Sequence, residues 1–153
     1  MLLDLEKSDF NKTLAPWIGR TSKMLNGYIS DVLNSNNISI TKQQWIILKI
    51  LNENPEGIIQ NKLAFITERN KASLTRLING MEKKNLVARI QSKLDSRKNI
   101  VYSTEKGTEL FLKTKPLMLN SIQKIQEGIT DDEMTSFRNI INKIQQNLTN
   151  QSK

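Results

Sequence analysis

The sequence predicts a mainly α-helical chain with a small β-hairpin near its middle. An amphipathic helix is expected over 71–84, because apolar residues recur with helical spacing at Leu74, Leu77, Ile78 and Met81. Two strand-like segments follow at 86–92 and 100–104, where residues alternate or are β-branched. Long apolar stripes mark the first and last helices. This order of elements is typical of a winged helix-turn-helix with N- and C-terminal dimerisation helices.

Positive charge is concentrated in one segment of the chain. Residues Arg69–Lys106 carry ten basic and three acidic side chains, so this segment supplies +7 of the net charge of +8. A charge cluster is usually only a solvated surface. Here it coincides with a helix and a hairpin, which favours a surface that meets a polyanion such as DNA.

The helix over 71–84 presents a small, polar and basic front opposite its apolar face. Asn70 is the expected N-cap, since its side chain can accept from a free backbone N–H. The candidate DNA contacts on the front and its flanks are Lys71, Ala72, Ser73, Thr75, Arg76, Asn79 and Lys83. Which of Arg76 and Asn79 reads a base and which holds a phosphate stays open. Lys83 could instead only complement the negative end of the helix.

The loop Lys93–Asn99 forms the basic tip of the expected hairpin. Asp95, Arg97 and Lys98 are candidate DNA contacts there, because the negative potential of a minor groove attracts Arg. The alternative for Asp95 and Arg97 is a simple ion pair within the turn. Exposed pairs contribute only about 0–1 kcal/mol to stability, so stability alone is a weak reason for this pair.

Several motifs in this region carry a resemblance to a known family. They are Thr75-Arg76-Leu77, Met81–Val87 followed by Arg89, Asp95-x-Arg97 and Thr104-x-Lys106-Gly107. In order and spacing these motifs resemble the recognition helix, wing and wing exit of the MarR family of bacterial transcriptional regulators. The resemblance covers nearly the whole chain. It implies that the carboxylate of Asp95 holds the guanidinium of Arg97, which enters the minor groove.

Three positions depart from the family pattern. Asn85 stands where the family usually has Gly, a mild change because Asn tolerates the left-handed conformation. Ser103 replaces a usual apolar residue before Thr104. Thr67-Glu68-Arg69 replaces a turn that more typically contains Gly, so the geometry of that turn is a question for the structure.

The other helices are expected from apolar periodicity and capping residues. They are Pro16–Asn34, Lys42–Asn52 after the N-cap Thr41, Ile59–Ile66, Thr104–Gln126, and a last helix after the capping box at Thr130–Glu133. Pro116 should kink or break the fourth of them, because it removes a hydrogen bond and crowds the preceding turn. Residues 1–13 are undefined, although Leu2, Leu5 and Phe10 could cover a partner helix.

These elements divide the chain into three parts. The first, 1–40, is an N-terminal segment and dimerisation helix; the second, 41–106, is the winged helix-turn-helix DNA-binding domain; the third, 107–153, holds the C-terminal dimerisation helices. The terminal stripes are wider than one domain needs, which indicates a homodimer and fits the family. A two-fold dimer spaces two recognition helices one or more DNA turns apart and so suits a pseudo-palindrome.

The family resemblance also implies a pocket that often takes a small aromatic or phenolic anion as effector. Trp17, Tyr28 and Trp45 could line such a pocket, but plain core packing is the simpler explanation for each. The sequence identifies neither an effector nor its ligand residues.

Composition argues against several kinds of chemistry. The chain has no Cys and no His, which removes disulfides, thiol redox chemistry, the commonest metal ligand and the commonest general base. The carboxylates Asp131, Asp132 and Glu133 sit in the first turn of a helix, where they complement its positive end. We therefore expect no cofactor, no metal and no enzyme. We also expect a cytoplasmic protein without membrane contact, since the sequence shows no signal peptide and no membrane span.

Taken together, these features predict a sequence-specific DNA-binding transcriptional regulator, and a repressor in particular. We expect a homodimer on a pseudo-palindromic operator in double-stranded DNA, with release by a small-molecule effector implied by the resemblance alone. The alternative is a basic protein–protein interaction module that binds an acidic partner.

Overall fold

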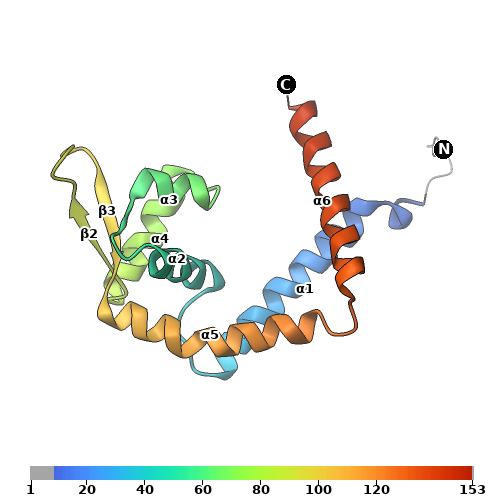
Figure 1. Ribbon diagram of the computed structural model, residues 1–153, viewed down its shortest axis with the longest axis horizontal. Coiled ribbons are helices and arrows are strands. Elements are labelled where there is room, and N and C mark those ends of the chain that lie inside the picture. Colours follow the sequence, from blue (N-terminus) through green and yellow to red (C-terminus); the bar gives the residue numbers. More distant parts are fainter. Residues whose placement is uncertain (1–8, 153) are drawn as a thin grey trace. The chain divides into compact units, whose positions relative to one another are not determined.

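A computed structural model of the protein describes residues 9–152, which form a mainly helical chain with one small sheet (Figure 1). The elements in chain order are η1 (Phe10–Lys12), α1 (Leu14–Ser35), α2 (Lys42–Glu53), β1 (Ile58–Ile59), α3 (Gln60–Ile66), α4 (Lys71–Lys83), β2 (Val87–Gln91), β3 (Asn99–Ser103), α5 (Glu105–Ile125) and α6 (Asp131–Gln151). The predicted mainly α-helical fold with a small β wing is confirmed, whereas the role of the terminal helices in dimerisation stays a prediction. Leu2 and Leu5 lie outside the described residues.

The chain divides into two compact units. The first ends at Met118 and contains α1 to α4, the sheet and most of α5. The second begins at Leu119 and contains the end of α5 and the whole of α6. The functional division at residues 40 and 106 stays a prediction.

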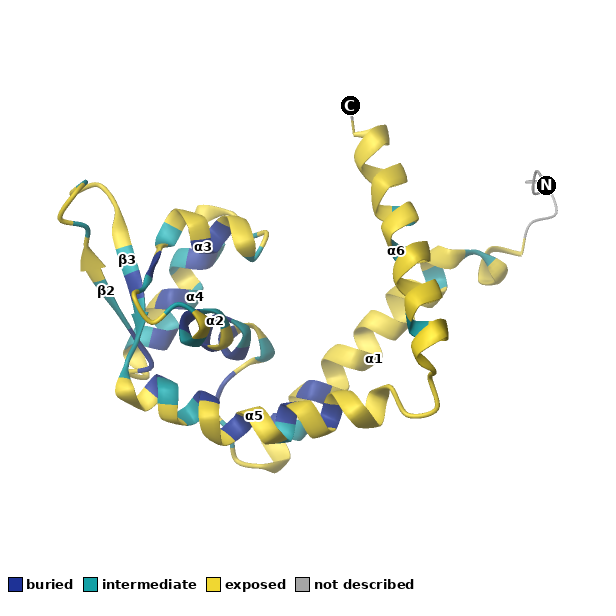
Figure 2. Ribbon diagram, viewed as in Figure 1, coloured by how far each residue is buried: buried dark blue, intermediate teal, exposed yellow. Residues whose placement is uncertain are grey.

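The hydrophobic core lies in the first unit, where Figure 2 shows the buried residues gathered on the inner faces of α2, α3 and α4. The predicted inward residues Leu48, Leu51 and Leu74 are almost completely buried. Trp45 is buried as well; its indole N–H donates to Thr114 Oγ1 at 2.7 Å and its ring centroid is 5.4 Å from that of Phe111. This packing gives the helix-turn-helix a rigid base.

The wing belongs to a three-stranded antiparallel sheet with the order β1-β3-β2, which corrects the expectation of a two-stranded hairpin. Ile58 pairs with Val101 and Ile59 with Ile100, so the start of the expected helix 59–66 is a strand. Two residues are too few for a strand period to appear in the sequence. In Figure 1 the hairpin of β2 and β3 projects beyond the helices of its unit.

Three helices of the first unit end on a left-handed residue that is not glycine. Asn37, Glu68 and Asn85 have φ angles of 56°, 53° and 58° and close α1, α3 and α4 respectively. At the end of α3 the N–H of Arg69 donates to the Ala64 carbonyl at 2.9 Å, and that of Glu68 to the Phe65 carbonyl at 3.1 Å. This double closure is the Schellman motif, so the turn keeps its geometry without Gly.

Helix α5 runs through Pro116 without a break, contrary to one of the two outcomes that the sequence suggested. Proline cannot donate to the carbonyl one turn before it, so the helix loses one bond there. Phe111 and Met118 lie on either side of Pro116 and are both buried in the core. Packing on both sides of the lost bond therefore holds the helix together.

Replacement of Glu68 by glycine should stabilise the protein. A non-glycine residue in the left-handed region costs roughly 1–2 kcal/mol, and part of that cost is offset by the greater freedom of Gly in the unfolded chain. We expect Glu68→Gly to raise the free energy of unfolding by about 1 kcal/mol in urea titrations. Glu68→Ala is the matched control, because alanine meets the same backbone restriction; an equal gain from it would contradict the explanation.

Candidate nucleic-acid interface

The N-terminus of α4 is fixed by its cap, as the sequence predicts. The side chain of Asn70 accepts a hydrogen bond from the N–H of Ser73 at 2.7 Å. On its apolar side Leu74, Ile78 and Met81 are buried. The helix is therefore held firmly by one face and one end.

The predicted front of α4 is exposed. Lys71, Ala72, Arg76, Asn79 and Lys83 are all exposed in the described chain. Within residues 9–152 the side chains of Lys71, Arg76 and Lys83 make no hydrogen bond and no ion pair. Three cations without a partner on one short helix suit an anionic ligand.

Two of the predicted site residues instead connect α4 to its neighbours. Ser73 and Thr75 are half-buried. Ser73 Oγ accepts from the Arg69 guanidinium at 2.9 Å, and Thr75 Oγ1 accepts from the Gln60 side-chain amide at 3.1 Å. The Thr75 hydroxyl thus joins α4 to α3, and the Ser73 hydroxyl joins α4 to the turn that precedes it.

Arg89, on strand β2, joins the wing to α4 and was not among the predicted site residues. Its guanidinium donates to Asn79 Oδ1 at 2.5 Å and forms an ion pair with Glu82. Arginine has only donors, so the oxygen of the Asn79 amide must face it. The sequence does not reveal this contact, because the position of Arg89 beside α4 depends on how β2 pairs with β3 in the folded protein.

The wing exit is closed onto the end of α4. Thr104 donates twice, through its N–H to the Leu86 carbonyl at 3.1 Å and through its hydroxyl to the Asn85 carbonyl at 2.6 Å. Lys106 Nζ donates to the Lys84 carbonyl at 3.0 Å. At Gly107 a Cβ atom would lie 2.1 Å from the Leu86 carbonyl oxygen, so only glycine permits this approach. The motif Thr104-x-Lys106-Gly107 therefore acts as one closure.

The tip of the wing is organised around Asp95. Asp95 Oδ1 accepts from the N–H of Arg97 at 3.1 Å and from its Nε at 3.2 Å, and Nη2 donates to Oδ2 at 3.5 Å. Lys98 Nζ lies 3.9 Å from the same carboxylate. The Arg97 side chain is nevertheless 89% exposed. The carboxylate thus orients a guanidinium that keeps most of its surface free.

These hydrogen bonds lower the pKa of the Asp95 carboxyl. The largest cause is the side-chain bond from Arg97, followed by its backbone N–H, and the charge of Lys98 adds to both. Because the folded-state pKa lies below the unfolded value, the ionised carboxylate stabilises the tip at neutral pH. That contribution is lost as the pH falls through the folded-state pKa.

The aromatic candidates for an effector pocket separate in the structure. Trp45 is core, as the simpler explanation predicts, but Trp17 and Tyr28 are 60% and 36% exposed. Trp17 lines a small hollow with Asn11, Pro16 and Arg20, and the Arg20 guanidinium carbon lies 5.8 Å from its ring centroid. The explanation by core packing within one chain is therefore wrong for Trp17 and Tyr28.

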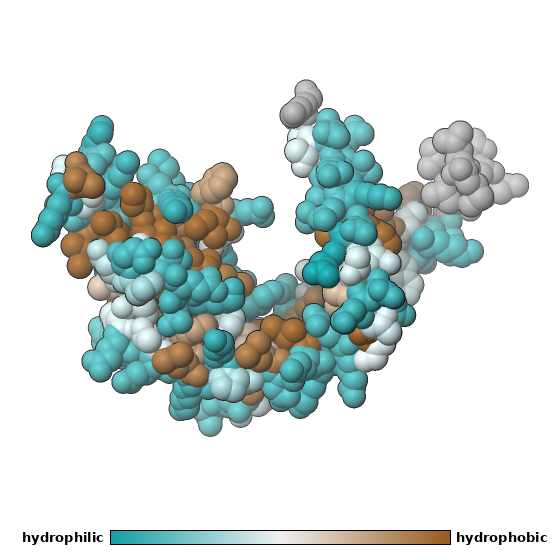
Figure 3. Space-filling model, in the orientation of Figure 1, coloured by the Kyte–Doolittle hydropathy of each residue, from teal (hydrophilic) through white to brown (hydrophobic). Residues whose placement is uncertain are grey.

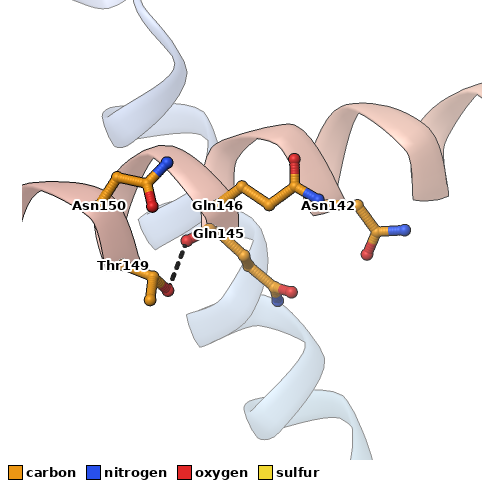
Figure 4. A pocket seen from close by; sticks show the side chains of 5 residues that line it. All are labelled: Asn142, Gln145, Gln146, Thr149 and Asn150. Atoms are coloured by element: carbon orange, nitrogen blue, oxygen red, sulfur yellow. Dashed lines mark hydrogen bonds between the residues drawn. The ribbon is translucent and has the colours of Figure 1, made fainter.

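A second hollow is polar and lies along α6 alone. Figure 4 shows the five side chains that line it, Asn142, Gln145, Gln146, Thr149 and Asn150. The Thr149 hydroxyl donates to the backbone carbonyl of Gln145 at 2.9 Å. No aromatic or charged group lines it.

The helices described by the structure include none with the length and apolar character of a membrane span.

Known proteins share both the sequence pattern and the fold. Residues 40–98 match the model of the MarR family. The homoprotocatechuate degradative operon repressor of Escherichia coli is 26% identical over 114 residues, which span 74% of this chain and 75% of that protein. The S. aureus MepR–DNA complex has a similar fold, with a TM-score of 0.80, 19% identity and coverage of 89% of this chain and 99% of MepR. CouR from Rhodococcus jostii RHA1, bound to p-coumaroyl-CoA, also has a similar fold. Its TM-score is 0.75 and its identity 20%, and the match covers 90% of this chain and 95% of CouR.

The Asp95 pKa offers a direct check of the wing geometry. Arg97→Ala removes the two side-chain bonds to the carboxylate, so the pKa of Asp95 should rise toward its ordinary value. The measurement is an NMR titration of the Asp95 carboxyl carbon. Lys98→Ala is the control, because its charge is the weaker cause, and the pKa should move less. A larger shift in the control would contradict this account of the tip.

Proposed function

Because the chain belongs to the MarR family of transcriptional regulators, we propose that it acts as a repressor. In this proposal a homodimer occupies a pseudo-palindromic operator and blocks transcription by its presence there. Its relative in Escherichia coli is named as an operon repressor, which supports the direction of the effect.

The observation that carries the proposal is the set of unpaired cations on α4 together with the oriented guanidinium of the wing. Lys71, Arg76 and Lys83 are exposed and unpaired within residues 9–152, and Arg97 is held by Asp95 at the tip. Cations without internal partners can neutralise phosphates at no cost in broken ion pairs. MepR, which shares this fold, has been crystallised with DNA.

In the proposed complex α4 enters the major groove and the wing reaches the adjacent minor groove. Ala72 at the front of α4 permits close approach, and Arg76 and Asn79 can donate to base edges or phosphates. Asn79 Oδ1 already accepts from Arg89, so its amide N–H groups are the atoms that remain free. Arg97 and Lys98 supply the positive charge that a narrow minor groove attracts.

Dimerisation is proposed from the apolar faces of the terminal helices. No residue of α6 is buried, and Phe137, Ile140 and Leu148 are more than half exposed. On α1 the large exposed side chains are Leu14, Trp17, Ile18, Met24, Leu25 and Tyr28. Figure 3 shows patches of apolar surface among hydrophilic side chains. Exposed apolar area on this scale marks an interaction site, and a second copy of the chain would cover it.

The proposal includes release by a small aromatic or phenolic effector. CouR, of the same fold, was crystallised with p-coumaroyl-CoA, an aromatic acyl ligand. In this chain the hollow beside Trp17 and Arg20 combines an aromatic ring with a cation, which are groups that suit an aromatic anion. Trp45 is closed by its contacts with Thr114 and Phe111 and contributes no open surface.

Selection of bound sequences from a random duplex pool tests the core of the proposal. We expect an enriched pseudo-palindrome whose half-sites are one or more helical turns apart. Binding of all duplexes alike would instead indicate the alternative, a basic surface for an acidic protein partner. Enrichment of a single asymmetric half-site would contradict the two-fold dimer.

Removal of the wing cation should weaken operator binding. Arg97→Ala should lower affinity and reduce the slope of log K against log salt by roughly 1 for each wing in contact, since fewer counterions are released. Binding is measured by fluorescence anisotropy at several salt concentrations. Lys49→Ala is the control, because it removes a cation that is paired with Glu53 on α2, outside the proposed interface. Equal effects of the two substitutions would count against the wing as a DNA contact.

Loss of α6 should abolish the dimer. A chain that ends at Glu127 lacks the helix whose apolar stripe the proposal places at the subunit interface, and the remaining stripe on α1 loses its cover. We expect monomers or aggregates by multi-angle light scattering, against a dimer for the full chain. A well-behaved truncated dimer would show that the interface lies elsewhere.

A further inference from the structure

The tip of the wing exposes a leucine completely. Leu94 is 100% exposed, which makes it the most exposed of the large apolar residues in the described chain. It contributes no packing to the fold. Single exposed apolar residues are common on surfaces, so exposure alone does not identify a function. The hydrogen bonds and charges around Leu94 give further evidence of one.

The backbone that carries Leu94 is ordered by hydrogen bonds. Ser92 Oγ accepts from the N–H groups of Leu94 and Asp95 at 3.3 and 3.4 Å, and the Ser92 N–H donates to the Lys98 carbonyl at 2.8 Å. The Lys98 N–H donates to the Asp95 carbonyl at 3.0 Å. The tip is thus an ordered turn that fixes the backbone of Leu94 before any ligand arrives, which lowers the entropy cost of binding.

The charges around Leu94 select the kind of ligand. Lys93 precedes it, Arg97 and Lys98 follow it, and all three are exposed. The one carboxylate in this stretch, Asp95, is occupied by Arg97. An apolar group among cations suits a polyanion that also offers apolar surface. The minor groove of DNA does so, because its walls are lined by the carbons of the sugars, and proteins insert leucine and similar side chains there.

We propose that Leu94 packs into the minor groove beside Arg97 and favours sites where that groove deforms readily, such as pyrimidine–purine steps. This inference rests on the proposed function, since it requires the wing to meet DNA. It assigns the tip two separate contributions, one ionic and one apolar. The two can be measured apart, because only the ionic contribution depends on salt.

The test compares Leu94→Ala with Arg97→Ala on the selected operator. Leu94→Ala should weaken binding by about fivefold for each wing in contact, as expected for the loss of part of a buried leucine. The slope of log K against log salt should stay at the wild-type value, whereas Arg97→Ala should reduce it. The melting temperature should not change, because Leu94 packs against nothing. Leu94→Met is the matched control and should bind within about twofold of wild type, since it preserves apolar volume.

The other possible results separate the role of Leu94 from the proposed function. Wild-type affinity for Leu94→Ala, with Arg97→Ala still weakened, would overturn the role of Leu94 and leave the proposed function intact. A lower melting temperature or a changed salt slope for Leu94→Ala would also overturn it, by showing a structural or an electrostatic origin. Failure of the wild-type protein to select any duplex would instead overturn the proposed function itself.

Discussion

The closure of the wing onto the end of α4 is the interaction on which the rest of the interface depends. The Leu86 carbonyl accepts from Thr104, and Gly107 passes so close to it that a Cβ atom has no space. The same few residues end α4, begin β2 and begin α5. In the proposed complex α4 and the hairpin contact two grooves of one duplex and must keep a fixed separation, which this closure sets at one backbone junction. Arg89 adds a second connection farther along the strand, through Asn79 and Glu82.

The cations of the basic segment divide into three groups by what they contact. Lys84, Lys106, Arg69 and Arg89 are engaged within the domain, with backbone carbonyls, hydroxyl or amide oxygens, or Glu82. Arg97 and Lys98 contact Asp95 at the tip of the wing, and the Arg97 side chain stays largely exposed. Lys71, Arg76, Lys83 and Lys93 have no such partner within residues 9–152. Net charge therefore overstates the number of groups that are available to a ligand. The free group lies on the front of α4 and at the tip of the wing, which are the two places where a DNA ligand is proposed.

Much of the fold could be predicted because local rules and tertiary packing agree in this chain. The N-caps Asn70, Thr41 and Thr130 act as their sequence contexts indicate. The departures have physical causes: strand β1 is too short for a period, and α5 does not break at Pro116 because the core contacts on both sides outweigh one lost hydrogen bond. Among the site residues, exposure on α4 followed from the helical wheel. The contacts of Ser73, Thr75 and Arg89 did not, because they join elements whose relative placement is set by the core.

The bare surface of α6 has a consequence for how the protein behaves on dilution. This helix has 21 residues, none of them buried, and a capping box at its start that also lowers the pKa of the Glu133 carboxyl. Most of the stability of a helix in a protein comes from packing of its amphipathic face rather than from propensity, and the face of α6 is not packed within its own chain. In the proposed dimer the partner subunit supplies that packing, so the helical content of α6 and the concentration of the chain are linked by mass action. If the chain dimerises as proposed, lowering its concentration would therefore also lower the free energy of unfolding of each remaining molecule.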